Sequence, residues 1–416
     1  MQKNIQGFKY LFSLISLFVI LIPEIDLAES FSVKLKNSLN FARPNEIVKI
    51  NAESLIEKKP NFNFDSFTVY EDKKEIFFEK VLNKNTDKQE ILLLISFEPG
   101  ETKEIIFTDS VKNKKTIKLT QAYLGQKTGY EKKEGFFTGG YFKSVNQTKV
   151  PSGHFAHDAL YQFEGPGWES EKVGYRLYLD ERNRTDIFGK KISGLFLDIT
   201  GKNDLVSDGN ESYQKMLDWG RDIFKVGNSL GIGSIATFYN NKVVTVTEID
   251  STLCMIFDGN LVSEVETTHY GWNLDKKYNV TTRYSIKANS RITEVNVLPD
   301  KGIENLCTGL AKHENTEFIV SKEDKDWRYI SIWGVQTLEN DNLGIAVFYS
   351  KSSLVEISGD DLSHFVILKL RDKKLTYYFT AAWEQERGGI KSKEEFLKYL
   401  DDELIKLNNP TKVVLN

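Results

Sequence analysis

Short runs of alternating apolar and polar residues follow one another from residue 29 onward. They lie at 31–37, 46–55, 65–72, 74–81, 90–98, 103–110 and 114–124, and Gly, Asn, Asp or Pro residues separate them. Val, Ile and Phe dominate these runs, and their spacing is typical of an antiparallel β-sandwich. We therefore predict a first domain over residues 29–125. No group of catalytic residue types stands out in it, so we interpret it as a structural module.

A polar stretch at 126–135 precedes a second region in which the alternating runs are longer. These runs lie at 174–180, 243–250, 252–258, 261–272, 278–287, 292–298, 327–337, 343–349 and 365–380. Many consecutive antiparallel strands with almost no helix predict a very large two-sheet sandwich. The fold class is therefore all-β, with a second domain over residues 126–390.

One helix is predicted, within a C-terminal segment at 391–416. Ser392 and Glu395 have the spacing of a capping box. An apolar stripe with helical spacing follows, formed by Phe396, Leu400, Leu404 and Leu407. We expect this helix to cover one end of a sheet.

The first 28 residues have the pattern of a signal peptide. Lys3 and Lys9 precede an apolar run at 10–22 that is too short to span a bilayer comfortably, and Ala28 is a candidate cleavage position. An uncleaved N-terminal anchor is the alternative. No later segment is apolar enough to cross a membrane, so we expect a periplasmic protein without membrane insertion after signal cleavage.

Overall charge and cysteine content narrow the class of protein. The 55 Lys and Arg against 59 Asp and Glu residues give 416 residues a net charge of -4, which does not favour nucleic acid as a partner. Cys254 and Cys307 are the two cysteines, and either a disulfide or two buried thiols fits them. Without a C-x-x-C motif, a thiolate-type zinc site is excluded.

The segment at 150–190 concentrates residue types suited to sugar chemistry. It contains His154, His157, Arg176, Arg182 and Arg184. In the predicted strand at 174–180, alternation gives one apolar face and one face with Arg176, a tyrosine and an aspartate. Such a polar face is typical of the floor of a carbohydrate cleft. A solvated sheet surface is the alternative. Further on, the glycines at 227, 231 and 233 lack the Lys-Ser/Thr of a phosphate loop, so we expect them to let backbone approach bound sugar or another strand.

Four motifs in order carry a family resemblance. They are P-S-G-H-x-x-H-D at 151–158, W-E-S-x-x-x-x-Y-R-L-Y at 168–178, D-I-F-G-K at 186–190 and D-W-G-R-D-I-F-K-V-G-x-S-L-G-I-G at 218–233, and the stretch YYFTAAWE at 377–384 also fits. The mature chain resembles an exported bacterial family, a domain of unknown function that occurs with polysaccharide-degrading enzymes in polysaccharide utilisation loci. The resemblance implies a galactose-mutarotase-like supersandwich. It also implies dehydration of the terminal uronic acid of ulvan oligosaccharides.

Elimination across C4–C5 of a uronic acid needs three groups and no cofactor. Arginine neutralises the carboxylate, and we expect Arg176 to do so, with Arg182 and Arg184 behind it. A base must take the C5 proton and an acid must protonate the leaving oxygen. The catalytic candidates for these tasks are His154, His157, His269, Tyr161 and Glu384, and the substrate-binding candidates are Tyr270, Trp272, Tyr284 and Trp383. The expected partner is an acidic oligosaccharide from an ulvan- or pectin-like polysaccharide.

Several alternatives stay open at this stage. Trp383 also suits a core position, Glu384 could pair with Arg387, and His313 and His364 suit a solvated surface. A divalent metal could be held by the histidines at 154, 157 and 269 with Asp158, although the spacing does not require one. A glycoside hydrolase or epimerase would need a carboxylate, for which Glu384, Asp158, Glu169 and Asp180 are available. A non-catalytic glycan-binding protein is the third hypothesis.

Overall fold

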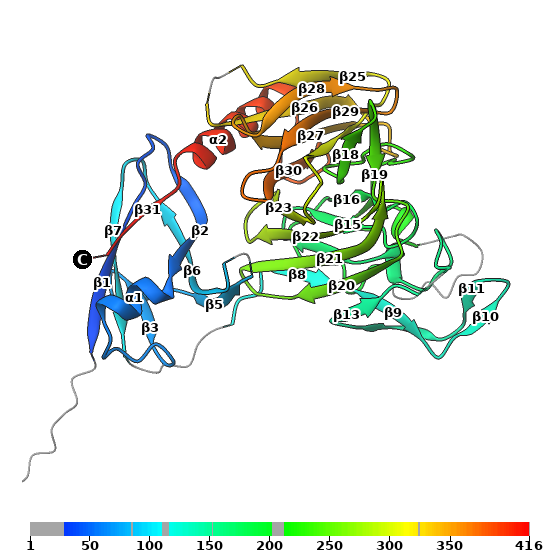
Figure 1. Cartoon of the computed structure of the whole chain (residues 1–416). Helices are drawn as coiled ribbons and strands as arrows, with labels where there is room; N and C mark the ends of the chain where they lie inside the picture. Colours follow the sequence, from blue (N-terminus) through cyan, green and yellow to red (C-terminus); the bar gives the residue numbers. More distant parts are fainter. Residues whose placement is uncertain are drawn as a thin grey trace, which may run out of the picture.

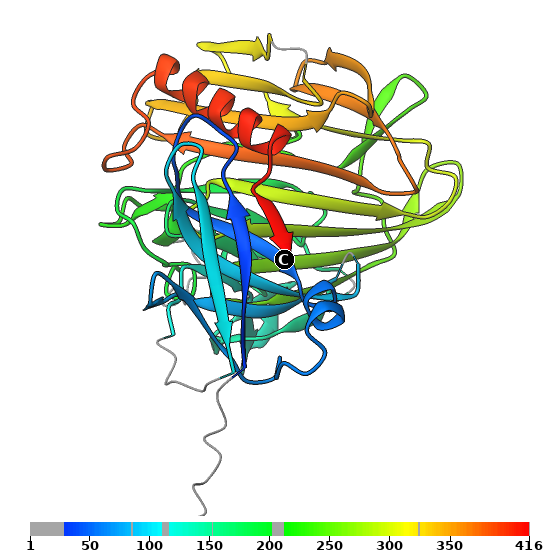
Figure 2. The same ribbon diagram turned by 90° about the vertical axis from the view of Figure 1, so that its left-hand side faces the viewer.

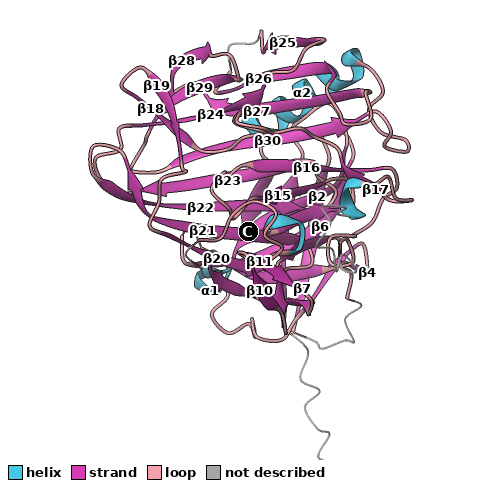
Figure 3. Cartoon of the chain, turned by 90° about the vertical axis from the view of Figure 1, so that its right-hand side faces the viewer, coloured by secondary structure: helices cyan, strands magenta, loops and turns pink. Residues whose placement is uncertain are grey.

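The computed structural model describes residues 29–84, 86–109, 116–151, 153–201, 212–322 and 325–415, which form two packed β units (Figure 1). The signal peptide predicted at 1–28 lies outside these residues. Strands dominate, with one long helix near the C-terminus (Figure 3), so the predicted all-β class is confirmed. Across the described ranges, no helix is both long and apolar enough to span a membrane.

The N-terminal unit is a sandwich of two small sheets. One contains β31 (Lys412–Leu415), β1 (Ser30–Lys36), β7 (Thr102–Thr108), β3 (Thr68–Glu71) and β4 (Lys74–Glu75), in that order. The other contains β2 (Arg43–Asn51), β6 (Lys88–Phe97) and β5 (Phe78–Asn83). Inward-facing residues such as Phe31, Phe67 and Phe107 fill the space between them. Alternation along the strands thus places the apolar residues in one core.

Three local features of this region differ from the prediction. The run at 46–55 ends in a helix, α1 (Ala52–Lys58), because the Asn51 side chain accepts the Ser54 amide and caps it. The C-terminal strand β31 pairs with β1, so the two ends of the described chain meet (Figure 2). From the run at 114–124, β8 (Thr120–Tyr123) joins the second unit by pairing with β14 (Gly167–Ser170).

The large unit is a sandwich with one wide sheet. Its order is β13 (Gln147–Lys149), β20 (Ser251–Phe257), β21 (Val262–Asn273), β22 (Lys277–Lys287), β23 (Ile292–Pro299), β30 (Leu375–Trp383), β27 (Asn342–Ser350), β26 (Trp327–Val335) and β25 (Thr316–Val320). Every pairing in it is antiparallel. The run predicted at 365–380 is split, because residues 371–374 turn the chain between β29 (Ser363–Lys369) and β30.

Two smaller sheets form the opposite layer. The first contains β17 (Gly220–Asp222), β16 (Thr185–Lys190), β15 (Gly174–Leu177), β14 (Gly167–Ser170) and β8. The second contains β19 (Lys242–Thr245), β18 (Ala236–Tyr239), β24 (Asn305–Ala311), β29 (Ser363–Lys369) and β28 (Leu354–Gly359). The remaining short elements are β9 (Gly125–Thr128), β10 (Glu131–Lys133), β11 (Phe136–Thr138), β12 (Tyr141–Ser144), η1 (Gln162–Glu164) and η2 (Ser212–Gln214).

A single apolar core joins the two layers. Trp168 from β14 stacks on Tyr284 from β22 with ring centroids 4.9 Å apart, and Tyr175 meets Phe379 edge-on. Cys254 and Cys307 are buried and free, which settles the open question of their pairing. At Gly233, a Cβ would lie 2.4 Å from the Phe379 ring, so this glycine lets backbone pass another strand.

Helix α2 (Lys393–Asn408) confirms the predicted C-terminal helix. Ser392 Oγ accepts the Glu395 amide at 3.2 Å, which forms one half of the predicted capping box. Glu395 reaches back one residue further, to the Lys391 amide at 2.7 Å. Phe396 and its stripe pack on Trp333 and other outward residues of β26, β27 and β30 (Figure 2). The helix therefore covers the outer face of the wide sheet rather than a sheet end.

Candidate functional site

The loop at 153–165 meets the turn that connects β15 and β16. The Leu179 amide donates to the Glu164 carbonyl at 3.0 Å, and the Tyr178 amide donates to the Arg184 carbonyl at 2.9 Å. In this loop, His157, Ala159, Phe163 and Glu164 all have positive φ. Backbone in this region is strained for residues other than glycine, and such strain gathers at functional sites. The contact between the loop at 153–165 and the β15–β16 turn is therefore our candidate site, which we call the loop–turn site.

One carboxylate links a surface imidazole to a guanidinium. The Nδ1 atom of His157 lies 3.1 Å from Oε1 of Glu164, and NH2 of Arg182 donates to the same oxygen at 2.6 Å. The side chain of His157 is 58% exposed and that of Arg182 is 24% exposed, whereas Glu164 is buried. Both basic groups can therefore reach a ligand from solvent while a buried anion positions them.

Arg182 is held in place with one nitrogen unused. Its Nε and NH2 atoms donate to the two oxygens of Asp180 at 2.9 and 2.5 Å, and its guanidinium carbon lies 3.7 Å from the centre of the Tyr178 ring. Among the described residues, its NH1 atom makes no hydrogen bond. Such a fixed guanidinium with spare donors is suited to binding a carboxylate.

Arg176 lies deeper and is saturated by carboxylates. Its NH2 donates to Asp186 and to Asp222, each at 2.6 Å, and its NH1 lies 3.5 Å from Glu164. The Tyr178 hydroxyl also donates to Asp186. Our expectation that Arg176 binds the substrate carboxylate is wrong in position, because its side chain is 3% exposed whereas that of Arg182 is 24% exposed.

The two aspartates that bind Arg176 have different surroundings. Asp186 accepts two guanidinium bonds and the tyrosine hydroxyl, which stabilises its charge. Burial, opposed by Arg176 and reinforced by the charge of Asp186, raises the pKa of Asp222 to about 8. A carboxyl group that is removed from water beside another carboxylate holds its proton more tightly. Asp222 therefore keeps its proton to a higher pH than an exposed aspartate does.

Arg184 belongs to the support of the turn. Its Nε donates to the Ser229 carbonyl at 2.7 Å, and its NH1 donates to the Arg182 carbonyl. Burial lowers the pKa of Arg184 to about 10. The side chain is buried, so it ties the β15–β16 turn to residues near 229 rather than to a ligand.

His154 and Tyr161 lie beneath the loop. His154 Nδ1 lies 2.7 Å from Asp158 Oδ2, its ring meets Tyr161 edge-on at 5.1 Å, and its Nε2 is buried without a partner among the described residues. The Tyr161 hydroxyl pairs with Thr148 at 3.0 Å, and burial raises its pKa above the usual range. Both side chains are therefore placed to shape the loop from below.

Candidates from the wide sheet are mostly buried in the core. His269 Nδ1 pairs with the Thr252 hydroxyl at 2.9 Å, and burial lowers its pKa to about 4. Trp272 donates to the Thr245 carbonyl at 3.1 Å, and Tyr284 is stacked under Trp168. Tyr270 is 39% exposed. The expectation that Trp272 and Tyr284 line an open cleft is wrong, because inward alternation points both into the sandwich.

Trp383 and Glu384, at the end of β30, both form hydrogen bonds with neighbouring side chains. Trp383 is buried in the core and donates to Asp341 at 2.8 Å, whereas Glu384 accepts a hydrogen bond from Asn342 at 2.6 Å. The expected solvation of His313 and His364 is also wrong. Their rings lie 5.2 Å from Phe224 and 4.0 Å from Phe318, respectively, and both side chains are partly buried.

The side chains that the sequence suggested as metal ligands do not lie together in one group. Within the described ranges, no three His, Cys, Asp or Glu side chains form a group suited to a metal ion. In the set considered from the sequence, His154 pairs with Asp158, His157 with Glu164 and His269 with Thr252. Glu169 is likewise engaged, since it forms a buried ion pair with Lys190 and accepts two backbone amides at 196–197.

Sequence reasoning missed the central acids of this site. Glu164, Asp186 and Asp222 were not among its candidates, although Asp186 opens the D-I-F-G-K motif and Asp222 lies within the motif at 218–233. A buried arginine requires anionic partners, so an arginine inside a strand was the available signal. Which acids approach it depends on the pairing of β15, β16 and β17.

Comparison with solved structures returned large carbohydrate-active proteins. An alpha-mannosidase from Enterococcus faecalis V583 matches with a TM-score of 0.45 and 9% identity over 92% of this chain and 46% of that chain. A glycosyl hydrolase family 38 protein from Enterococcus faecalis matches with a TM-score of 0.47 and 9% identity, over 92% and 47%. The chain thus spans about half the length of each.

A search of curated proteins found no match. Comparison with family models matched residues 35–413, which include both β units and helix α2. All the motifs that carried the family resemblance lie inside this range. The chain therefore belongs to the family described as a domain of unknown function, DUF4861.

Proposed function

We propose that this chain is a carbohydrate-active carbon–oxygen lyase that removes water across C4–C5 of a terminal uronic acid in an acidic oligosaccharide. The observation that carries the proposal is the contact of Glu164 with both His157 and Arg182 at the surface of the loop–turn site. In this proposal the imidazole of His157 is the base, and the neighbouring guanidinium of Arg182 binds the substrate carboxylate. Export to the periplasm, where such oligosaccharides would be met, is part of the same proposal.

Arg182 takes the role first considered for Arg176. Its NH1 donors bind the C6 carboxylate, and this neutralisation makes the C5 proton more acidic. Asp180, Glu164 and the Tyr178 ring hold the guanidinium, so little ordering is needed when the substrate binds. Arg176 with its aspartates is a buried positioning group, because it anchors Tyr178 and Glu164 from behind.

His157 performs both proton transfers in this scheme. Glu164 engages Nδ1, so we assign the base to Nε2. Nε2 takes the proton from C5, the C5–H electrons form the C4–C5 double bond, and the C4–O bond breaks. The same imidazolium then gives the proton to the departing hydroxyl, which leaves as water. The products are an unsaturated uronate and one water, and the histidine returns to its neutral form.

The carboxylates of the site favour elimination over hydrolysis. A glycosidase needs two carboxyl groups on either side of the scissile bond. Here Glu164, Asp180, Asp186 and Asp222 are all buried and bound to arginines. The lyase scheme requires no further carboxylate.

Absorbance and product mass test the proposal together. With uronate-terminated oligosaccharides from ulvan and pectin, we expect ultraviolet absorbance to rise without added reagent and a product lighter by one water. His157→Gln should lower kcat by about 10²-fold or more. Arg182→Lys should mainly raise KM, because a lysine keeps the charge but loses the planar fork.

Other outcomes would identify the alternatives. New reducing ends without absorbance would indicate a hydrolase, and unchanged mass with inverted stereochemistry would indicate an epimerase. Binding with no product under any of these conditions would indicate a glycan-binding protein. Each of these results would overturn the lyase proposal.

A further inference from the structure

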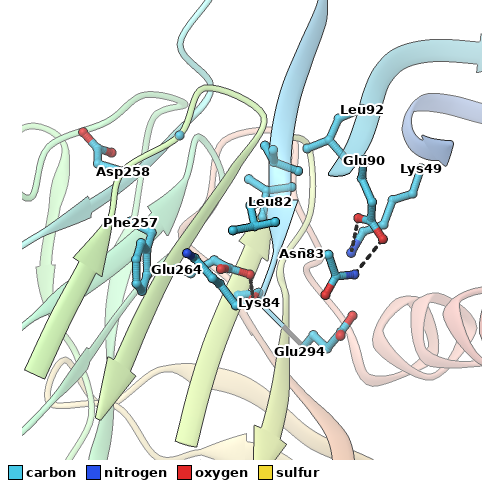
Figure 4. Close-up of a pocket in the computed structure, with 14 residues that line it drawn as sticks. Lys49, Leu82, Asn83, Lys84, Glu90, Leu92, Phe257, Asp258, Glu264 and Glu294 are labelled. Carbon is cyan, nitrogen blue, oxygen red and sulfur yellow. Dashed lines mark hydrogen bonds and ion pairs between the residues drawn. The ribbon is translucent and has the colours of Figure 1, made fainter. Parts of the chain in front are cut away.

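A pocket lies between the N-terminal unit and the outer face of the wide sheet. It has a volume of about 310 Å³, and β2, β5 and β6 form one wall while β20 to β23 form the other (Figure 4). This volume falls within the range of ligand sites, which often lie between domains. No residue of the loop–turn site lines it, so the two sites are separate.

The two walls are fixed against each other. Glu79 from β5 accepts the backbone amides of Asn260 and Leu261 at 2.9 and 2.8 Å. A small apolar cluster that includes Leu92 and Leu261 crosses the boundary. The pocket is therefore formed before any ligand arrives, which lowers the entropic cost of binding.

Strand register lines the sheet wall with hydrogen-bonding groups. Ser285 pairs with Glu264 on one side and with Glu294 on the other. Ser285 donates to Oε1 of Glu264 at 2.5 Å, and Asn296 donates to Oε1 of Glu294 at 2.9 Å. Among the described residues, Oε2 of Glu294 accepts no hydrogen bond, so it is available to a hydroxyl donor.

The N-terminal wall supplies donors to the same pocket. Lys49 Nζ lies 4.0 Å from Oε2 of Glu90, and Asn83 donates to Oε1 of Glu90 at 2.6 Å (Figure 4). At that separation the ammonium keeps hydrogens for a ligand. Donors on one wall thus face acceptors on the other.

Apolar groups and net charge define the class of ligand. Phe257, Leu82, Leu92 and Val262 contribute apolar surface beside the polar groups. A sugar ring matches this mixture, because its hydroxyls both donate and accept while its C–H faces are apolar. The lining carboxylates Glu90, Asp258, Glu264 and Glu294 outnumber Lys49 and Lys84, which disfavours an anionic sugar.

We propose that this pocket binds a neutral sugar residue of a glycan. Glu294 and Glu264 would accept hydrogen bonds from hydroxyls, Lys49 would donate to them, and Phe257 would cover a C–H face. The site is independent of the elimination proposed above, since it would serve a lyase, a hydrolase or a binding protein equally. It would hold the glycan at a distance from the reacting end.

Saturation-transfer NMR that observes the ligand, recorded with the whole protein, tests this site. The probes are L-rhamnose, D-xylose and D-galactose, each added alone at millimolar concentration. We expect transfer to at least one of them. Glu294→Gln and Phe257→Ala should each weaken the affinity for that sugar by about tenfold, as loss of a hydrogen bond to a charged group or of apolar contact predicts.

Two controls separate the sites. Glu356→Gln changes an exposed carboxylate on β28 and should leave transfer unchanged. His157→Gln should leave sugar binding unchanged while it abolishes elimination. A thermal melt shows whether Phe257→Ala is folded at the temperature of the experiment. If it is not, Glu294→Gln alone tests the site, because this substitution preserves the size of the side chain. No transfer from any probe, an affinity unchanged by Glu294→Gln, or transfer lost with His157→Gln would overturn the proposal.

Discussion

His157 and Glu164 contact each other across a loop in which both have left-handed backbone conformation. Nδ1 of His157 lies 3.1 Å from Oε1 of Glu164, and their φ values are 65° and 69°. This conformation is costly for residues with a Cβ, so the surrounding packing must hold it. The contact gives the exposed imidazole a defined orientation. The same carboxylate also anchors Arg182, which makes Glu164 the centre of the proposed site.

Replacing this carboxylate should damage catalysis more than folding. Glu164→Gln removes the charge that orients His157 and Arg182, and we expect kcat to fall by about 10²-fold, as for other residues that orient a catalytic histidine. Steady-state kinetics with a uronate-terminated oligosaccharide measures the change. Glu181→Gln is the matched control, because among the described residues Glu181 accepts one hydrogen bond, from the Ala156 amide at 3.1 Å. Equal losses in both variants would contradict the assigned role.

The aspartates on Arg176 should respond oppositely to amide substitution. Asp222→Asn mimics the protonated acid, so we expect the free energy of unfolding at pH 7 to change by about 1 kcal/mol or less. Asp186→Asn removes a carboxyl oxygen that accepts two bonds from the buried Arg176 and one from the Tyr178 hydroxyl, and should cost about 3–5 kcal/mol. Urea unfolding monitored by tryptophan fluorescence distinguishes them. Similar costs for both would place the proton elsewhere.

The stability of the protein should depend on Asp222 between pH 3.8 and about 8. Its ordinary pKa of 3.8 rises to about 8 in the fold, so the folded state keeps a proton that the unfolded state releases between these values. Stability from this group is therefore greatest below pH 3.8 and is lost as pH rises toward 8. Asp222→Asn should flatten that part of the curve of unfolding free energy against pH.

His269 should limit stability on the acid side. Burial lowers its pKa from 6.5 to about 4, so the unfolded state binds a proton before the folded state does. Stability from this group is full above pH 6.5 and is lost as pH falls through 4, by about 3 kcal/mol in total. His269→Asn can keep a bond to Thr252 but cannot titrate. Its loss of stability between pH 6.5 and 4 should be smaller than that of wild type.

The C-terminal strand should stabilise the opposite end of the chain. Truncation after Pro410 removes β31 and makes β1 an edge strand. Val413 and Leu415 are partly buried against the N-terminal core, so we expect a loss of about 2 kcal/mol. Hydrogen exchange should accelerate at the β1 amides. Val413→Ala should reproduce part of the effect, whereas Val414→Ala, at an exposed position, should not.

Local sequence patterns predicted strand positions better than strand partners. Alternation in β20 to β23 and the capping box of α2 were readable from neighbouring residues alone. In contrast, β8 pairs with β14 of the second unit rather than with the strands that precede it in sequence, and β31 pairs with β1 from the other end of the described chain. Short strands carry too few alternating residues to specify partners, since pairing depends on which edges other elements leave open.

Residue types by themselves determined the all-β class and the C-terminal helix, and they indicated the segment that contains the proposed reactive groups. Only the tertiary structure decided which of those groups face solvent. Arg176 and Trp272 have the chemistry of a sugar site but are buried, whereas His157 and Arg182 reach the surface. The physical reason is that burial depends on the layer packed over a strand face. That layer includes the loop at 153–165, whose backbone has no local periodicity to predict its path.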